Sequence, residues 1–374
     1  MKILVYRLGS LGDTCIVIPL FNALKRRYPT ASVTLLTNIP VNGKAIPSAD
    51  LLIDGGLIND VIAYPVSLRK ISRLLTLWKV LKAQKFDYIL NITSARGVIA
   101  GIRDFLFLSS LGASILEGTP LRYRDQFVTF NEKFGIYDKE FTRIKKRVNS
   151  LSDIVGDGSS DWLWSLHLTS REIKIAEKWK NELGTKKYIA FSIGTKVEIK
   201  DWGDKAWSEC LSLISAEYPE MGLIVLGSSD EYSRSCLLAR HWFGCSLVLA
   251  GKITVRESAA VLMGAEFFLG QDSGPMHLAT CVGTRCIAVF SARNPVGQWF
   301  PNRVGHTIFY HKVECASCNL EHSCPFDLKC LKLIKPKFVA EKVISLISEH
   351  QISQPMCNYW IDPCSNYRRE IMFF

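Results

Sequence analysis

A short polar turn between two apolar segments constrains the fold of this chain more than any other feature. The segments 267–269 and 286–290 read as buried strands, and the residues between them begin Gly-Gln-Asp-Ser-Gly-Pro at position 270. Ser273 or Gly274 can cap a helix, and Pro275 suits its first turn. The pattern predicts strand, turn, short helix and strand. The helix start presents free N–H groups and a positive dipole end at the sheet edge, where a diphosphate can bind.

A second strand–turn–helix pattern opens the chain. Residues 2–6 read as a buried parallel strand, and the turn Arg-Leu-Gly-Ser-Leu-Gly-Asp-Thr follows from position 7. Gly9 and Gly12 permit backbone geometry closed to other residues and let a ligand approach closely. Asp13 then begins a helix, at the edge where open parallel sheets bind ligands. A lone Asp at a helix start is most often an N-cap, but the flanking glycines and the second such pattern favour a functional carboxylate.

Strand and helix signals alternate along both halves of the chain. In the first half we expect strands at 2–6, 32–36, 87–92 and 113–116, and helices at 14–27, 68–83 and 97–111. In the second half we expect strands at 188–193, 222–226, 246–249, 267–269 and 286–290, and helices at 205–217, 231–243, 255–263, 275–281 and 337–348. This alternation predicts an α/β fold in which two Rossmann-like domains face each other across a cleft.

The periodic pattern of apolar residues that marks helices and strands is lost between about residues 131 and 166. The loop at 156–160 is typical of a hinge. We therefore expect an N-terminal domain at 1–165 and a C-terminal domain at 166–350 that carries a Cys-rich loop at 311–332. The tail, 351–374, reads as irregular.

The charge balance points to anionic partners. The 374 residues include 46 basic and 35 acidic side chains, a formal net charge of +11. Between Val61 and Phe86 there is no acid, and six basic residues alternate with apolar ones: Arg69, Lys70, Arg73, Lys79, Lys82 and Lys85. This amphipathic stretch is either an ordinary surface helix or a contact for an anionic membrane or a phosphorylated glycolipid. We expect no nucleic-acid partner, because finger spacing, RNA-binding aromatic signatures and repeats are all missing.

A third loop supplies cations. Gly194, Thr195 and Lys196 follow the first expected strand of the second half, and Lys200 lies shortly after them. Two lysines on a loop at the same sheet edge as the turn at 272–274 can clamp a diphosphate.

Taken together, these motifs resemble a known family. They are Arg7-x-Gly9-x-x-Gly12-Asp13, Gly194-Thr195 with Lys200-Asp201-Trp202, Leu249-Ala250-Gly251-Lys252, Asp272 to Ala279 and the loop around Trp299. The chain is similar to the inverting glycosyltransferases of the GT-B fold that include the ADP-heptose:lipopolysaccharide heptosyltransferases. The resemblance implies an N-terminal acceptor-binding domain and a C-terminal domain that binds the nucleotide sugar.

The resemblance also implies residue roles. Asp13 would be the general base, and Lys200 would stabilise the departing nucleoside diphosphate. The donor site would contain Thr195, Lys196, Asp272, Ser273, Gly274 and His277, with Ser10 and Gly12 in a loop at the acceptor. Asp272 would accept hydrogen bonds from sugar hydroxyls or turn N–H groups. His277 would be either a packing residue or a neighbour of the phosphates. No catalytic metal is required.

The implied partners are a nucleotide-sugar donor, foremost ADP-heptose, and an anionic acceptor in the lipopolysaccharide core or a related surface glycan. The chain would be cytoplasmic, with a peripheral contact at the cytoplasmic face of the inner membrane, because it has neither a secretory signal nor an apolar run long enough to span a bilayer. A protein acceptor and a different sugar nucleotide are alternatives. Other classes are a dinucleotide-dependent oxidoreductase, although Gly9-x-x-Gly12 lacks the full fingerprint, and a non-catalytic sugar-nucleotide-binding protein.

Four of the twelve cysteines are clustered: Cys315, Cys318, Cys324 and Cys330. In a cytoplasmic chain such a cluster indicates thiols or metal ligands rather than disulfides. Some relatives in the resembled family carry a comparable cluster that holds iron. The alternatives are a structural zinc or iron site without a catalytic role, and free thiols in a loop.

Overall fold

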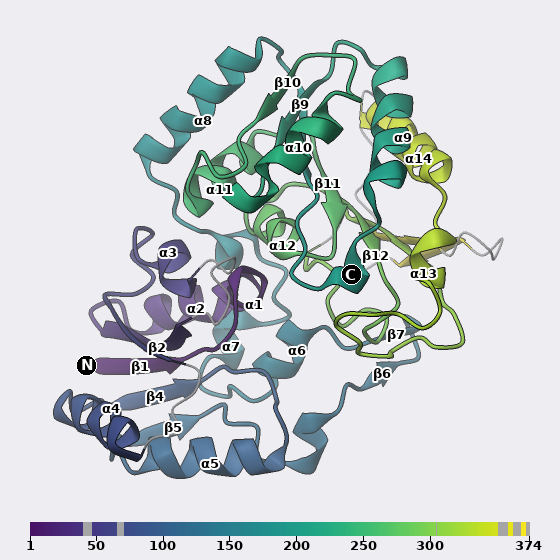
Figure 1. The fold of residues 1–374 in the computed structure, drawn as a ribbon. Coiled ribbons are helices and arrows are strands. Elements are labelled where there is room, and N and C mark those ends of the chain that lie inside the picture. The colour runs from purple at the N-terminus through teal and green to yellow at the C-terminus, as the bar shows by residue number, and fades with distance from the viewer. Residues whose placement is uncertain (40–46, 66–70, 304, 351–357, 362–367, 372–374) are drawn as a thin grey trace. The chain divides into compact units, whose positions relative to one another are not determined.

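A computed structural model describes residues 1–39, 47–65, 71–303, 305–350, 358–361 and 368–371. The chain divides into two compact units (Figure 1). The first contains Met1–Asn131 and Tyr137–Thr169, and the second contains Glu132–Ile136 and Ser170–Phe374.

The first unit is built on a parallel sheet of five strands in the order β3-β2-β1-β4-β5. Its strands are β1 (Lys2–Tyr6), β2 (Ser32–Ile39), β3 (Asp60–Pro65), β4 (Tyr88–Asn91) and β5 (Ile115–Glu117). Ile3, Leu4 and Val5 of β1 are fully buried, as expected of a central strand covered on both faces. The order reverses beside β1, which makes its carboxyl end a topological switch point.

The helices of this unit are mostly short. They are α1 (Leu11–Cys15), α2 (Ile18–Arg27), α3 (Ser48–Leu52), α4 (Ile71–Ala83), α5 (Val98–Ser109), α6 (Glu140–Lys145) and α7 (Ser152–Val155), with the 3-10 turns η1 (Tyr123–Gln126) and η2 (Asp161–Trp164). A short pair of strands, β6 (Phe130–Asn131) and β7 (Ile136–Tyr137), precedes α6.

The second unit repeats the same architecture on a larger sheet, in the order β10-β9-β8-β11-β12-β13-β14-β15. Its strands are β8 (Tyr188–Ser192), β9 (Gly222–Val225), β10 (Ser246–Val248), β11 (Phe267–Gln271), β12 (Cys286–Phe290), β13 (Thr307–Tyr310), β14 (Asn358–Ile361) and β15 (Arg368–Ile371). All pairs are parallel except the antiparallel pair of β14 and β15.

Longer helices accompany this sheet. They are α8 (Ser170–Leu183), α9 (Asp204–Glu217), α10 (Tyr232–Ala239), α11 (Val255–Met263), α12 (Gly274–Cys281), α13 (Lys329–Lys332) and α14 (Pro336–His350), with the 3-10 turns η3 (Glu198–Lys200) and η4 (Ser229–Glu231). The core between the sheet, α9 and α14 contains Trp202, Trp207 and Phe191, whose rings meet edge to face. This aromatic packing anchors the loop that follows β8.

The structure corrects several sequence predictions. The helix expected at 14–27 is two helices, because the chain turns at Val17 (φ −108°, ψ 4°) and Pro19 starts a new first turn. Strand β3 was not expected, because its residues at the sheet edge are only partly buried and give no buried-strand signal. Helix α8 and strand β13 were not expected either. The tail is not wholly irregular, since β14 and β15 extend the sheet. Residues 66–70, at the start of the basic stretch, lie outside the described residues.

Candidate active site

The residues predicted for the site lie at the carboxyl edges of the two sheets. In the first unit, Asp13 follows β1. In the second unit, Thr195, Lys196 and Lys200 follow β8, and the turn at 272–274 follows β11. Strands β8 and β11 are hydrogen-bonded neighbours, so their two loops emerge side by side. Each unit therefore presents its part of the predicted site where open parallel sheets bind ligands.

Asp13 is held by the turn that precedes it. Its Oδ2 atom accepts hydrogen bonds from Ser10 N at 2.9 Å and Ser10 Oγ at 3.2 Å. Gly9 has a φ of +121°, and a Cβ there would stand 2.4 Å from Cβ of Asp13. Only glycine fits this position. Asp13 is the third residue of α1 and so is not the N-cap, which is Ser10.

A buried arginine supports the same turn. Arg7 is fully buried, and its guanidinium donates to the main-chain oxygens of Ile92 at 2.6 Å and Asp13 at 2.5 Å. One of its nitrogens lies 3.6 Å from Oδ1 of Asp13. Burial lowers the pKa of Arg7, and the charge of Asp13 partly offsets this effect. The side chain of Asp13 keeps 29% of its surface exposed, so a fixed carboxylate is available to a substrate.

In the second unit, Lys200 and Asp272 form an ion pair. Nζ of Lys200 lies 2.6 Å from Oδ2 of Asp272, and the side chains are 14% and 5% exposed. The predictions placed Asp272 near hydroxyls or turn N–H groups and did not foresee this pair. The ammonium group balances the carboxylate, so an acidic residue at this helix start is compatible with the predicted anion site.

Gln271 holds the loop that follows β8 and carries Lys196 and Lys200. Sequence reasoning missed this residue. It is fully buried, donates from Nε2 to the carbonyl of Ile193 at 2.6 Å and accepts at Oε1 from the N–H of Trp202 at 3.1 Å. These two bonds tie both ends of the loop after β8 to the end of β11. A polar side chain ending a strand of apolar residues is the only signal that could have found it.

The remaining donor-site residues surround the start of α12. Ser273 is its N-cap, and Oγ of Ser273 is buried without a hydrogen-bond partner in the described part of the chain. Thr195 hydrogen-bonds within its own loop, through the carbonyl and N–H of Val197. His277 is buried, with its ring 6.3 Å from that of Trp299. Both interpretations of His277, packing residue and neighbour of the phosphates, stay predictions.

Glu231 is a further acidic residue at this edge. One of its oxygens accepts from the N–H of Ser228 at 2.9 Å. Its carboxylate lies so close to the main chain that a Cβ on Gly194 or Gly227 would meet it at 2.5 or 2.4 Å. The spacing Ser228-x-x-Glu231 is a capping-box signature, and it could have located this carboxylate at the end of β9.

The cysteine cluster gives no support to a metal site. Cys315, Cys318, Cys324 and Cys330 form no disulfide within the described residues. Across the described ranges, no group of three or more His, Cys, Asp or Glu residues is arranged to hold a metal ion. Burial raises the pKa of Cys330, which packs against the core of the second unit. Both alternatives, a structural metal and free thiols, therefore stay predictions. The described helices also include none that is long and apolar enough to cross a bilayer.

Comparison with known proteins gives consistent results. Residues 74–328 match the family model described as glycosyltransferase family 9 (heptosyltransferase). The chain is 25% identical over 310 residues to lipopolysaccharide heptosyltransferase 3 of Escherichia coli K12, covering 78% of this chain and 82% of that one.

Solved structures share its fold. A family 9 glycosyltransferase from Veillonella parvula matches with a TM-score of 0.69 and 16% identity, over 93% of this chain and 97% of the other. The Escherichia coli heptosyltransferase WaaC with ADP-2-deoxy-2-fluoro heptose matches with a TM-score of 0.55 and 16% identity, over 94% and 100%. Two Rossmann-like units therefore form a GT-B fold here, as the sequence predicted.

Proposed function

Because this chain belongs to glycosyltransferase family 9, the heptosyltransferases, we propose that it transfers heptose from ADP-heptose to a hydroxyl of the lipopolysaccharide core. The names of its relatives support this donor and acceptor. The observation that carries the proposal is the Lys200–Asp272 pair at the start of α12. The pair brings an ammonium group to the residue before the N-cap of α12, and an ammonium group together with a helix start suits a leaving diphosphate.

We assign the base to Asp13. In an inverting transfer the acceptor oxygen attacks the anomeric carbon while the bond from that carbon to the diphosphate oxygen breaks. The carboxylate of Asp13 takes the hydroxyl proton, and the nucleoside diphosphate leaves with the bonding electrons. Ser10 and Arg7 keep the carboxylate in one orientation, which lowers the reorganisation needed at the moment of attack.

We assign stabilisation of the leaving group to the second unit. Lys200 meets the charge that develops on the diphosphate, with the N–H groups at Ser273 and Gly274 as additional donors. Oγ of Ser273, which has no hydrogen-bond partner among the described residues, is available to donate to a phosphate oxygen. These groups supply the charge stabilisation, so the reaction needs no catalytic cofactor. Glu231, at the neighbouring strand end, is our candidate for binding the ribose hydroxyls, which acidic residues commonly bind in Rossmann-like folds.

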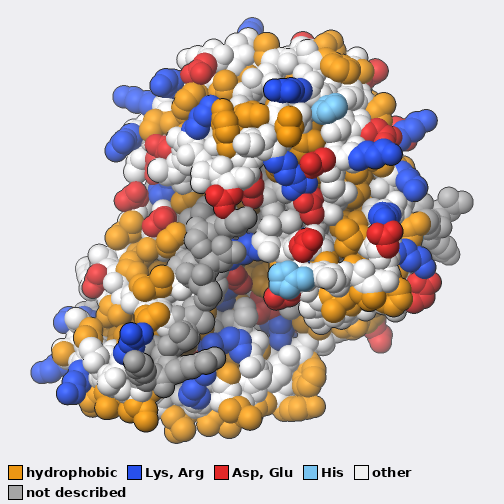
Figure 2. Space-filling model, viewed as in Figure 1, with side chains coloured by type: hydrophobic (Ala, Val, Ile, Leu, Met, Phe, Trp, Pro, Cys, Tyr) orange, Lys and Arg blue, Asp and Glu red, His pale blue; other side chains and the backbone are white. Residues whose placement is uncertain are grey.

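We further propose a peripheral contact with an anionic membrane through α4 and α5. Four exposed aliphatic side chains on these helices are Ile71 (75%), Leu75 (52%), Ile99 (86%) and Leu106 (63%). Lys82 and Trp78 of α4 bond to the chain at the end of α5, so the two helices form one surface. Figure 2 shows hydrophobic side chains and basic side chains together in the region of these helices. Apolar groups flanked by cations suit a lipid interface.

Two measurements test the proposed function. In a thermal-shift panel of ADP-, GDP- and UDP-sugars, we expect ADP-heptose to raise the melting temperature most, because a ligand that binds only the folded state stabilises it. Asp13→Asn should lower turnover on the order of 10²–10⁴-fold, the usual contribution of a general base, without weakening ADP binding. Turnover within a few-fold of wild type would remove Asp13 from the mechanism. Transfer to a protein acceptor and not to a glycolipid would support the alternative acceptor.

The membrane contact has its own test. Wild-type protein should sediment with phosphatidylglycerol vesicles, and the Ile99→Gln/Leu106→Gln variant should not, whereas both should catalyse transfer to a lipid-free acceptor equally. Equal sedimentation of the two proteins would contradict the contact.

A further inference from the structure

Arg234, in the first turn of α10, binds two aspartates that follow Lys200 in the chain. Its Nη1 and Nη2 atoms donate to the two carboxylate oxygens of Asp201, at 2.6 and 3.0 Å, and its Nε atom donates to Oδ1 of Asp204 at 2.5 Å. A bidentate bond between a guanidinium and a carboxylate fixes both the distance and the orientation of the two groups. Because Asp201 directly follows Lys200, this contact holds the chain next to the proposed leaving-group cation.

The ion pairs of Arg234 are partly shielded from solvent. The side chains of Arg234 and Asp201 are 32% and 25% exposed. Burial by itself lowers the pKa of Arg234, but the hydrogen bonds and charges of Asp201 and Asp204 outweigh it and raise that pKa above its ordinary value. A partly buried pair is screened less by salt than a fully exposed one. The contact is therefore suited to holding the loop when a charged ligand binds beside it.

This pairing also keeps Asp201 from competing for Lys200. The ammonium group of Lys200 lies 2.6 Å from Asp272, although Asp201 is its neighbour in the chain. Both oxygens of Asp201 are bound by Arg234, and Oδ1 also accepts from the N–H of Gly203 at 2.9 Å. Without Arg234, the carboxylate of Asp201 would be free to bind Lys200 or to repel a nearby diphosphate. Arg234 thus leaves the ammonium group to Asp272 and to the leaving group.

The start of α10 contacts the first part of the same loop as well. Glu231, the N-cap of α10, lies three residues before Arg234. Its carboxylate is so close to Gly194 that a Cβ on that glycine would stand 2.5 Å from Oε1. Gly194 begins the loop after β8 and Asp201 lies near its end, so one turn of chain holds the loop at two points. Glu231 is also our candidate for binding the donor ribose.

The loop has further anchors that do not depend on Arg234. Gln271 hydrogen-bonds to main-chain groups at both ends of the loop, and Trp202 packs in the aromatic core. These contacts hold the residues on either side of Lys200 and Asp201, whereas Arg234 holds Asp201 itself. Removal of Arg234 should therefore displace the ammonium group without unfolding the loop.

We propose that Arg234 is a positioning residue for the glycosyl transfer, which fixes the ammonium group of Lys200 by holding Asp201. The assignment rests on the proposed function and adds how its leaving-group cation is kept in place. It also connects the two ends of the donor, because Glu231 and Arg234 lie on one turn of chain. A donor whose ribose binds Glu231 steadies the turn that holds its own leaving-group cation.

A double-mutant cycle in the full-length enzyme tests this role, with every assay run below the melting temperature of each variant. Arg234→Gln should lower turnover roughly 10–100-fold, the effect of a small displacement of a catalytic group. In the Lys200→Met background the same change should lower turnover less than two-fold, because no ammonium group is left to position. Arg234→Lys keeps the charge but not the bidentate bond, so it should recover only part of the turnover. Equal losses in the two backgrounds would indicate a merely structural role and overturn the proposal.

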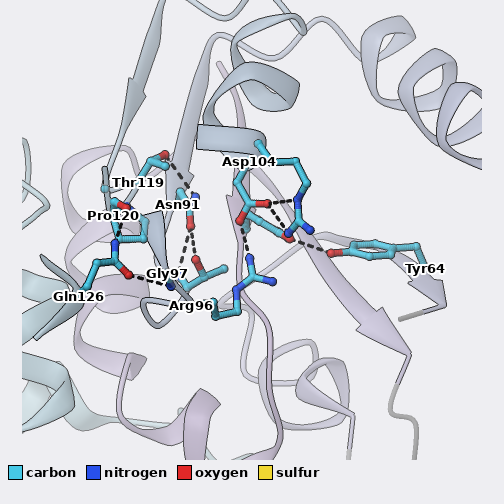
Figure 3. A network of polar contacts seen from close by, with 12 residues as sticks. Tyr64, Asn91, Arg96, Gly97, Asp104, Thr119, Pro120 and Gln126 are labelled. Carbon is cyan, nitrogen blue, oxygen red and sulfur yellow. Dashed lines mark hydrogen bonds and ion pairs between the residues drawn. The ribbon is translucent and has the colours of Figure 1, made fainter. Parts of the chain in front are cut away.

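Arg96 provides the matched control. It is an arginine of the first unit with a similar exposed fraction, 36%, and it is paired with Asp104 (Figure 3). Asp104 keeps a second partner, Arg103, at 2.9 Å. Arg96→Gln therefore removes an ion pair of the same kind in the other unit, and its effect on turnover should be the same in the wild-type and Lys200→Met backgrounds. If that effect also vanished with Lys200→Met, the assignment of Arg234 would be wrong.

Calorimetry with ADP separates this proposal from the transfer itself. ADP carries the diphosphate that Lys200 meets, so Arg234→Gln should weaken ADP binding several-fold in the wild-type background and leave it unchanged in the Lys200→Met background. ADP binding that is weakened equally in both backgrounds, or in neither, overturns the positioning role even if transfer occurs. A wild-type enzyme whose variants show the expected ADP pattern but which transfers no heptose counts against the proposed function instead.

Discussion

Removing the ammonium group of Lys200 should separate its structural contribution from its chemical one. Lys200→Met leaves the carboxylate of Asp272, only 5% exposed, without its partner. Breaking a buried ion pair in this way lowers the free energy of unfolding by about 3–5 kcal/mol. We take the lower end of this range because Lys200 itself is 14% exposed. A domain of this size loses roughly 2–4 °C per kcal/mol. We therefore expect the melting transition of the second unit to fall by about 6–12 °C.

The double variant Lys200→Met/Asp272→Asn is the matched control. It removes both charges, so it should melt within about 3 °C of wild type, since replacing a whole buried pair is often neutral. Its turnover should nevertheless stay on the order of 10²–10³-fold below wild type, as for Lys200→Met, because neither variant can stabilise the leaving diphosphate.

Differential scanning calorimetry gives the melting temperatures, and ADP release under saturating substrates gives the turnover. A Lys200→Met protein as stable as wild type would refute the electrostatic reasoning. Recovery of turnover in the double variant would refute the catalytic role.

Three further outcomes are expected. Gly9→Ala should lower the free energy of unfolding by about 1–3 kcal/mol and turnover at least ten-fold, because the new Cβ would displace Asp13. Denaturant melts and steady-state kinetics measure the two effects. The affinity for ADP, measured by calorimetry, should not change. Burial raises the pKa of Cys286 to about 12, so at pH 8 its thiolate is scarce. Iodoacetamide should then label exposed Cys318 but not Cys286 in native protein, and both in urea; equal labelling of the native protein would contradict this. Anaerobically purified protein should hold less than one zinc or iron per chain by elemental analysis, and chelator treatment should leave turnover unchanged, whereas one bound ion per chain would restore the metal-site interpretation.

The sequence predicted the parts of the fold whose signals are local. Buried central strands such as β1 and β11 are continuous apolar runs, and their glycine-containing turns are readable without a structure. Edge strand β3 was not readable, because exposed and partly buried residues alternate irregularly along it. The break between α1 and α2 also escaped prediction, since Pro19 is equally acceptable in the first turn of a helix.

The candidate site was predictable as a set of residue types but not as a set of contacts. Asp13, Lys200 and Asp272 each stand out beside glycines or strand ends. Their partners come from distant positions, as the pairing of Lys200 with Asp272 shows. Gln271 acts through two main-chain groups, at Ile193 and Trp202, that no sequence pattern marks.

A turn that occurs in both units identifies positions for fluorescent labels. Helices α2 and α9 both end in a Tyr-Pro turn, and Tyr28 and Tyr218 share nearly the same backbone angles, φ −129° and −127° with ψ 68° in each. These turns lead into the amino ends of β2 and β9. The proposed catalytic residues follow the carboxyl ends of the strands, at the opposite edge of each sheet. The exposed residues that follow, Thr30 and Glu220, are therefore suitable attachment points for a pair of fluorophores. A labelled enzyme of this kind could report motions of its two halves during turnover while every reacting group stays native.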